Sequence, residues 1–270
     1  MKTWLLPLVG GITIAACVTV PYTQRSQLVL LSEAEEMKLG ADAYQEVLAD
    51  EKVVRDPKIV SLVTDVGQRI AAVASKPEYQ WEFTVIDDPS QANAFALPGG
   101  KVAVYTGIFP IARDTAGLAA IIGHEVSHAI ARHGAERMSQ GVVAQIAATG
   151  VAIGLGGQDP AVRNGVMQAF GLGVQVGAIL PFGRAQESEA DRIGLILMAK
   201  AGYDPSAALA LWQRFEEAGR AGPPEFLSTH PSYGTRIQQI TKWLPEAGQY
   251  YSASNAAPVI TLPTAVASGR

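Results

Sequence analysis

The chain has 270 residues, of which 48% are hydrophobic and 17% are charged, a balance typical of a folded globular protein. The formal net charge is −4, and lysine and arginine form no cluster with aromatic residues, so we expect no nucleic-acid partner. The single cysteine, Cys17, excludes an internal disulfide and any zinc site built from several thiolates. A metal in this protein would therefore be bound by His, Glu or Asp side chains.

The amino-terminal segment has the layout of a bacterial lipoprotein signal. Lys2 is followed by an apolar run too short to span a membrane, and small residues precede Cys17. This order resembles a lipobox, in which the cysteine becomes the lipid-bearing first residue of the mature protein, although an ordinary signal peptide also fits. We expect a signal peptide over residues 1–16, a membrane anchor at Cys17 and an extended tether over residues 17–31. By the same resemblance, Val18 in place of aspartate permits sorting to the outer membrane.

Two helices are predicted before the first chemical motif. Ser32 and Glu35 form a capping box, which predicts a helix that ends near Ala49. A second helix follows Pro57, where apolar residues recur at helical spacing as far as Ile70. We expect these helices to pack around a catalytic core rather than to contribute chemistry to it.

A small β-sheet is predicted next. Residues 81–87 alternate as a half-buried strand, and residues 93–97 and 101–106 flank a turn at residues 98–100 as a β-hairpin. The exposed edge of this sheet is either a surface that binds an extended peptide or a structural cover for the helix that follows. With the helices on either side, these elements predict an α+β fold that is mainly helical.

The central motif is His124-Glu125-x-x-His128, within an apolar helix predicted over residues 115–132. Residues four apart lie on one face of a helix, about 6 Å apart along its axis, so both imidazoles can reach one metal ion. Glu125 then lies beside the metal, where a carboxylate can take a proton from an activated water. The alternative of two solvated histidines is disfavoured because the flanking residues are those of a buried helix.

The end of this helix gives a negative result. Arg132 and Gly134 are predicted to close the helix, with Gly134 as its C-cap and His133 as a helix-terminus residue rather than a ligand. Metzincins require a glycine at position 131 and a third histidine at position 134, which this chain lacks. The third ligand must therefore come from elsewhere. The Gly-rich apolar stretch over residues 141–182 predicts a helical hairpin beside the site, either a lid or a membrane-contacting element.

The best candidate for the third ligand follows on a second helix, predicted to run from residue 186 to about Lys200. Glu187 and Asp191 are four apart and share a face, whereas Glu189 points nearly opposite. We expect Glu187 to bind the metal and Asp191 to accept the free ring N–H of a ligating histidine. The alternative is a solvated acidic first turn that the helix dipole favours.

The fourth histidine, His230, lies in a loop between a helix predicted over residues 205–218 and the last helix, whose N-cap we expect to be Ser232. His230 could occupy the fourth zinc position, hydrogen-bond the oxyanion during turnover, or be a surface residue. Arg236 is a weaker candidate with a structural role. Residues 252–270 are rich in Ser, Ala, Pro and Thr and are predicted to be disordered.

Five segments in this order, SEAEE, NAFALPGG, HEVSHAIARH, ESEAD and STHPSYGTRI, resemble the HtpX/Oma-type zinc metalloproteases, which are gluzincins related to the CAAX prenyl proteases. The resemblance is closest to periplasmic lipoprotein members and covers most of the chain. It implies a gluzincin core over residues 32–251, with the small sheet beside the motif helix. It also implies one zinc ion bound by His124, His128 and Glu187, Glu125 as general base, and His230 as a residue that can cap the zinc in a latent state.

These features predict a zinc-dependent endopeptidase of the bacterial cell envelope. The resemblance implies misfolded or stalled outer-membrane and periplasmic proteins as substrates, and we expect Glu125, Asp191 and His230 to assist catalysis. The alternative is a non-catalytic zinc-binding lipoprotein that serves as a chaperone or scaffold. Glu125 disfavours this alternative, because a binding protein needs no base beside its metal. A peptidase of prenylated substrates is disfavoured because the sequence shows no set of membrane spans.

Overall fold

The computed structural model describes residues 17–154, 183–221, 224–230 and 234–264. The expected signal peptide and most of the predicted helical hairpin over residues 141–182 lie outside these ranges. The described chain is mainly helical with one three-stranded sheet, so the predicted α+β class, mainly α, is confirmed.

The first two helices form as the sequence predicts. Helix α1 (Glu33–Ala49) begins at the capping box of Ser32 and Glu35. Helix α2 (Pro57–Val73) has Asp56 as its N-cap and buries one apolar face, which includes Ile59, Val63, Val66 and Ile70. Both helices therefore owe their start to local capping. Apolar periodicity positions α2, whereas α1 buries Glu36, Gly40 and Tyr44.

The sheet consists of β3 (Glu82–Ile86), β4 (Ala94–Leu97) and β5 (Lys101–Tyr105) in the order β3-β5-β4. Strand β5 runs parallel to β3 and antiparallel to β4. The predicted turn joins β4 and β5, and Gly99 and Gly100 both adopt positive φ there, at 86° and 87°. Strand β4 is at one edge of the described sheet and packs against the motif helix.

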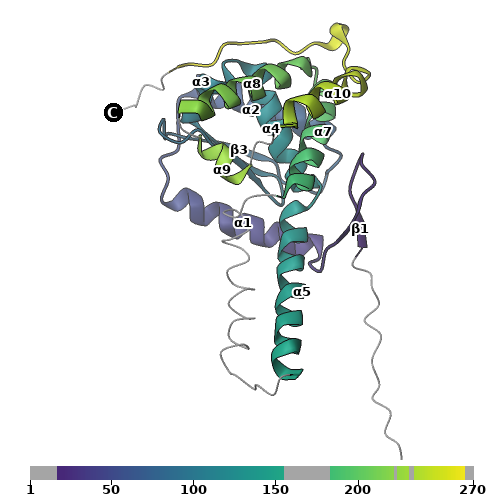
Figure 1. Ribbon diagram of the computed structural model, residues 1–270. Coiled ribbons are helices and arrows are strands. Elements are labelled where there is room, and N and C mark those ends of the chain that lie inside the picture. Colours follow the sequence, from purple (N-terminus) through teal and green to yellow (C-terminus); the bar gives the residue numbers. More distant parts are fainter. Residues whose placement is uncertain (1–16, 155–182, 222–223, 231–233, 265–270) are drawn as a thin grey trace, which may run out of the picture.

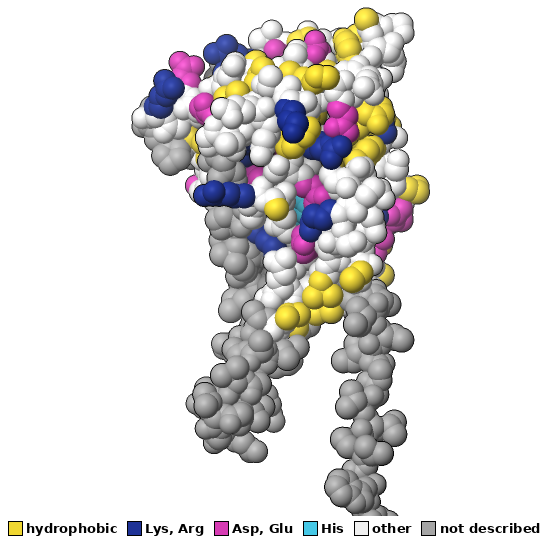
Figure 2. Space-filling view, turned by 45° about the vertical axis from the view of Figure 1, so that its right-hand side comes forward, with side chains coloured by type: hydrophobic (Ala, Val, Ile, Leu, Met, Phe, Trp, Pro, Cys, Tyr) yellow, Lys and Arg dark blue, Asp and Glu magenta, His cyan; other side chains and the backbone are white. Residues whose placement is uncertain are grey.

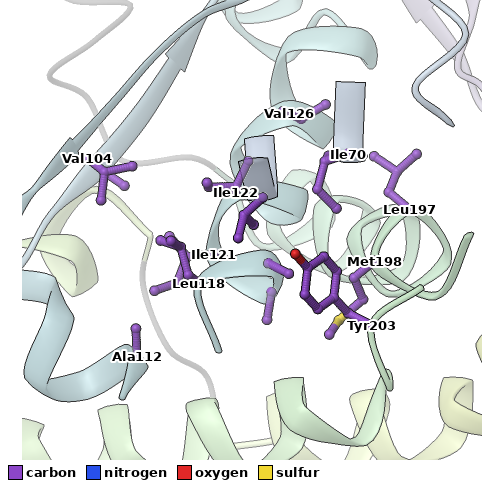
Figure 3. Close-up of a cluster of buried hydrophobic side chains, with 14 of the residues drawn as sticks. Ile70, Val104, Ala112, Leu118, Ile121, Ile122, Val126, Leu197, Met198 and Tyr203 are labelled. Atoms are coloured by element: carbon purple, nitrogen blue, oxygen red, sulfur yellow. The ribbon is translucent and has the colours of Figure 1, made fainter. Parts of the chain in front are cut away.

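Helix α4 (Thr115–Ile130) is the centre of the fold, and all of its residues are buried. Figure 3 shows its apolar side chains among those of α2, β5 and α7 (Arg184–Lys200). Two glycines allow α4 and α7 to lie against each other. A Cβ atom on Gly194 would lie 3.0 Å from the backbone nitrogen of His124, and one on Gly123 would lie 3.1 Å from the carbonyl oxygen of Gly194. This close approach brings the acidic residues of α7 to the histidines of α4.

Most of the remaining described elements pack around this helix pair, whereas α5 extends away from it (Figure 1). Helices α8 and α10 pack against each other and against α4 and α7, respectively, and α3 contacts α4 and α8. Their bounds are η1 (Thr106–Ile108), α3 (Phe109–Ala112), α5 (His133–Gly154), α8 (Ser206–Ala221), α9 (Glu225–Thr229), α10 (Arg236–Gly248) and η2 (Ala253–Asn255). Helix α10 has Thr235 as its N-cap, and the predicted cap, Ser232, lies outside the described residues.

The end of α4 differs from the prediction. The helix closes at Ala131, and Arg132 adopts a left-handed φ of 58°, so the chain turns and α5 begins at His133. The guanidinium of Arg132 forms an ion pair with the buried carboxylate of Glu36 on α1, which holds this turn. The expectation that Gly134 caps the helix was therefore wrong, because a distant ion pair stabilises a non-glycine residue in the left-handed region.

The segment expected to be an extended tether is a β-hairpin instead. Strands β1 (Cys17–Thr19) and β2 (Ser26–Leu28) pair antiparallel, and the hairpin packs against the start of α5. Val20 is fully buried, and the side-chain amide of Gln27 donates a 2.6 Å hydrogen bond to the carbonyl of Ala131. Polar contacts with the body of the protein thus order a segment that has little local signal of its own.

The carboxyl-terminal prediction was also wrong for residues 252–264. This segment lies along α4, where Thr115 donates its hydroxyl to the carbonyl of Pro258 and accepts the backbone N–H of Ile260. Leu262 is buried, with 4% of its surface exposed. Composition indicated disorder, but backbone hydrogen bonds to the first turn of α4 hold the segment in place.

Candidate metal centre

Three elements that are distant in sequence bring the candidate site residues together. Helix α4 contributes the two motif histidines and Glu125, α7 contributes Glu187 and Asp191, and His230 follows the last turn of α9. All six side chains are buried, at 1–5% exposure. Figure 2 accordingly shows almost no histidine surface on the face that it presents. The predicted residues therefore do converge, and they do so beneath the surface.

Four of these side chains direct ligand atoms at one point. The Nε2 atoms of His124 and His128 lie 3.1 Å apart, and Nδ1 of His230 lies 3.2 Å from the former. Carboxylate oxygens of Glu187 lie 3.1–3.5 Å from these three nitrogens. All four ligand atoms lie within 4.8 Å of one another.

This arrangement fits a zinc ion. Ligand atoms about 2.0–2.1 Å from a tetrahedral zinc are separated by about 3.3–3.4 Å, which matches the observed spacing. The two motif histidines differ in pKa. Burial lowers the pKa of His124, but hydrogen bonds to Asp191 and Glu187 outweigh it and raise the pKa to about 9, whereas burial holds the pKa of His128 well below its ordinary value. Three imidazoles and one carboxylate form a donor set that zinc prefers.

Glu125 lies beside the four ligand atoms and contributes none of them. Its Oε1 is 3.3 Å from Nε2 of His230, and the backbone N–H of Ala96 on β4 faces its carboxylate. Burial raises the pKa of Glu125, against the opposing charges of the nearby histidines. A carboxylate in this position can accept a proton from a metal-activated water and release it again.

Asp191 contacts the ring nitrogen of His124 that faces away from the other ligand atoms. Its Oδ1 lies 3.0 Å from Nδ1 of His124, which leaves Nε2 of that ring directed at the other ligands. Arg236 contacts Asp191 twice, at 2.7 Å from Nε and from Nη2, and its Nη1 lies 3.0 Å from Oε2 of Glu187. The guanidinium also lies 3.3 Å from the centre of the Trp212 ring. The sequence indicated only a structural role for Arg236, yet it joins both acidic residues of the site.

His230 is fixed by an aromatic stack. Its ring lies 4.5 Å from that of Phe226, which in turn stacks on Phe215 at 5.0 Å, and its backbone N–H donates to the carbonyl of Phe226. Burial raises the pKa of Glu187, but the charge of His230 and hydrogen bonds with the histidines hold it well below its ordinary range. The structure thus buries His230 with its Nδ1 among the candidate ligand atoms, so it is not a surface residue.

His133 is the residue that sequence reasoning missed. Its side chain is fully buried, with Nδ1 2.9 Å from Nδ1 of His128 and Nε2 2.9 Å from Oε2 of Glu189. Glu189 faces away from the four ligand atoms, as its helical position predicts, but it faces His133 instead of solvent. The one available signal was the position of His133 five residues after His128, at the predicted end of a buried helix.

Comparison with known proteins places this geometry in a family. Residues 60–244 match the model of peptidase family M48. The chain belongs to peptidase family M48. The mitochondrial metalloendopeptidase OMA1 of Schizosaccharomyces pombe is 40% identical over 235 residues, which cover 84% of this chain and 66% of that protein. The β-barrel assembly-enhancing protease of Yersinia pestis is 31% identical over 212 residues, 77% of this chain and 43% of that protein.

The M48 chain spans only part of several relatives. The putative β-barrel assembly-enhancing protease of Vibrio cholerae, for example, is 33% identical over 202 residues, 73% of this chain but 41% of that protein. The predicted resemblance to the Oma-type metalloproteases is confirmed, and family membership places the chain among the metallopeptidases. Its location and substrates are matters for proposal.

Proposed function

We propose that this M48 protein is a zinc-dependent endopeptidase of the bacterial cell envelope that cleaves misfolded or incompletely assembled proteins. One observation carries the proposal: four buried ligand atoms converge with zinc spacing, and a carboxylate with a raised pKa lies beside them. A bound zinc ion accounts for the four ligand atoms. The carboxylate of Glu125, which contributes no ligand atom, is accounted for by hydrolysis, which needs a base beside the metal.

His124, His128 and Glu187 would hold the ion. When bound, zinc would supply a Lewis acid that polarises the attacking water and the scissile carbonyl. Glu125 accepts a proton from the water as its oxygen bonds to the carbonyl carbon, and it passes this proton to the amine nitrogen as the C–N bond breaks. Asp191 keeps the Nδ1–H of His124 engaged, so that Nε2 stays available as a ligand.

The position of His230 supports a latent state as part of this proposal. Its Nδ1 occupies the fourth ligand position, and its Nε2 lies 3.3 Å from Glu125, where the reacting water needs to be. In our proposal, substrate reaches the centre only when His230 moves away. The movement would break the stack on Phe226. A role of His230 at the oxyanion is the alternative to this latent state.

The edge strand β4 suits an extended substrate. The backbone N–H of Ala96 on this strand faces the carboxylate of Glu125, so the strand runs directly beside the reacting atoms. A peptide added along an edge strand is bound through its main chain, with little demand on its side chains. This mode of binding favours unfolded segments, and it supports a role in clearing misassembled envelope proteins.

Anchoring through Cys17 completes the proposal. The cysteine is exposed in β1, so acyl chains on its sulfur would point away from the body of the protein. Among the helices of the described ranges, none has the length and apolar character needed to cross a membrane. Two further relatives are named as mitochondrial enzymes, from Saccharomyces cerevisiae and Homo sapiens, so the envelope location depends on the lipobox and on the β-barrel assembly-enhancing relatives.

A metal analysis combined with casein digestion tests this function. The full chain should bind one zinc ion and cleave casein, and Glu125→Gln should keep the zinc but lose cleavage by about 10²-fold or more, since general base catalysis contributes about that much. Absence of zinc in the wild type, or full activity of Glu125→Gln, would contradict the proposal. Client binding without cleavage by the wild type would favour the chaperone or scaffold instead.

A further inference from the structure

A chain of polar side chains runs from the metal centre, where it is buried, to the amino-terminal hairpin, where it is half-buried. It begins at His128, passes through His133 to Glu189, and ends at Arg25 and Thr23 in the turn between β1 and β2. None of these contacts involves the Asp191 side of the site. The proposed hydrolysis does not by itself require them.

The geometry fixes the direction of each hydrogen bond when zinc is bound. Nε2 of His128 faces the other ligand atoms, so its lone pair is used there and the ring hydrogen must be on Nδ1. That hydrogen is donated to Nδ1 of His133, which therefore carries its own hydrogen on Nε2. His133 then donates from Nε2 to the carboxylate of Glu189. Only this arrangement leaves His128 able to bind the metal.

The hairpin in turn holds Glu189. Arg25 donates to its Oε2 from Nε at 2.8 Å, and the hydroxyl of Thr23 donates to its Oε1. The same guanidinium reaches Glu136 on α5 at 2.6 Å, and Gln186 donates to that carboxylate at 2.7 Å. Each oxygen of Glu189 thus has a hydrogen-bond donor from the hairpin, which prevents the carboxylate from turning away from His133.

We propose that His133 is a positioning residue for the metal ligand His128, and that the amino-terminal hairpin holds the supporting carboxylate, Glu189, in place. The inference rests on the proposed zinc site. Asp191 supports His124 by a direct contact, whereas Nδ1 of His128 lies against His133, which in turn contacts Glu189. The imidazole of His133 therefore connects the carboxylate of Glu189 to His128 through two hydrogen bonds.

Zinc affinity of the full chain, measured by competition with a chromophoric chelator, tests the inference. His133→Phe should weaken zinc binding by about 10- to 100-fold, the range seen when a partner of a ligating histidine is lost. His133→Asn should recover most of the affinity, because its side-chain oxygen can accept the Nδ1–H of His128. Glu189→Gln should give a smaller loss, and Glu246→Gln, which alters an ion pair between α10 and α7 remote from His133, should give none.

Nitrogen-15 NMR of histidine-labelled protein gives a second readout, because the chain has only four histidines. In the zinc-loaded wild type, His128 should show a slowly exchanging Nδ1–H, and in His133→Phe that hydrogen should exchange faster. Arg25→Met should produce the same change more weakly, without altering the ligands themselves. If the wild type binds zinc but His133→Phe keeps its affinity and its His128 signal, the inference is wrong. If the wild type binds no zinc, the proposed function fails first.

Discussion

Replacing Arg236 by methionine should strongly destabilise the metal-free protein. The guanidinium is 2% exposed and lies between the carboxylates of Asp191 and Glu187, with contacts of 2.7–3.0 Å. Methionine keeps much of the volume over Trp212 but leaves two buried carboxylates without their counter-charge. Removing one partner of a buried ion pair exposes the full desolvation cost of the other.

The expected loss can be bounded from these distances. With an effective dielectric constant of about 20, a unit charge pair at about 3 Å interacts by about 5–6 kcal/mol before desolvation is counted. Breaking a buried pair typically costs about 3–5 kcal/mol, and we expect Arg236→Met to fall in that range. Arg236→Lys should lower the free energy of unfolding by an intermediate amount. An ammonium group keeps the charge but cannot contact both carboxylates as the planar guanidinium does.

Urea unfolding in the presence of a chelator measures this effect. The matched control is Arg192→Met, which also removes an arginine–carboxylate pair between α7 and α10, but one whose side chains are 34% and 36% exposed. That control should lose about 1 kcal/mol or less. If Arg236→Met lost no more than Arg192→Met, the ion pairs would not be the source of stability, and the reasoning would be refuted.

Three further outcomes follow from the structure. Gly194→Ala should separate α4 from α7 and destabilise the protein by about 1–3 kcal/mol, because its Cβ would meet the backbone of His124 at 3.0 Å; thermal unfolding measures the loss. His230→Ala should raise the initial rate of casein cleavage by freeing the fourth ligand position, and a lower rate would instead indicate a role at the oxyanion. Burial raises the pKa of Glu189, but hydrogen bonds from His133, Arg25 and Thr23 lower it to about 2. Since its unfolded pKa is about 4.3, this stabilisation is present above pH 4.3 and is lost as the pH falls towards 2, so Glu189→Gln should flatten the stability curve in that window.

The sequence predicted the parts of the site that depend on local periodicity. His124 and His128, and likewise Glu187 and Asp191, share a face because a helix brings every fourth residue round to the same side. The apolar flanks of the motif helix predicted that its polar face would be buried, and the structure buries this face and that of Glu187 and Asp191. The close approach of α4 and α7 also depends on Gly123 and Gly194 at the point where the two helices cross. A single sequence does not identify such a pair.

What the sequence could not predict depends on contacts between distant residues. His133 became a buried partner of His128 only because Arg132 turns the chain with φ 58°, and an ion pair to Glu36, 96 residues earlier, stabilises that turn. The hairpin over residues 17–28 is held by contacts such as Arg25 with Glu189, 164 residues apart. Composition and periodicity carry no information about such pairs. They therefore predicted a tether over residues 17–31 and a helix end capped by Gly134.

The two motif histidines of α4, His124 and His128, thus depend on residues near opposite ends of the described chain. His124 is supported by Asp191, whose charge is balanced by Arg236 on the last helix. His128 is supported through His133 by a carboxylate whose charge is balanced by Arg25, near the start of the described chain. In both cases an arginine from a distant element neutralises a buried acid of α7, which would otherwise be too costly to bury. The ligand geometry therefore depends on the packing of both the amino-terminal hairpin and α10, so loss of either arginine should weaken zinc binding although neither contacts the ion.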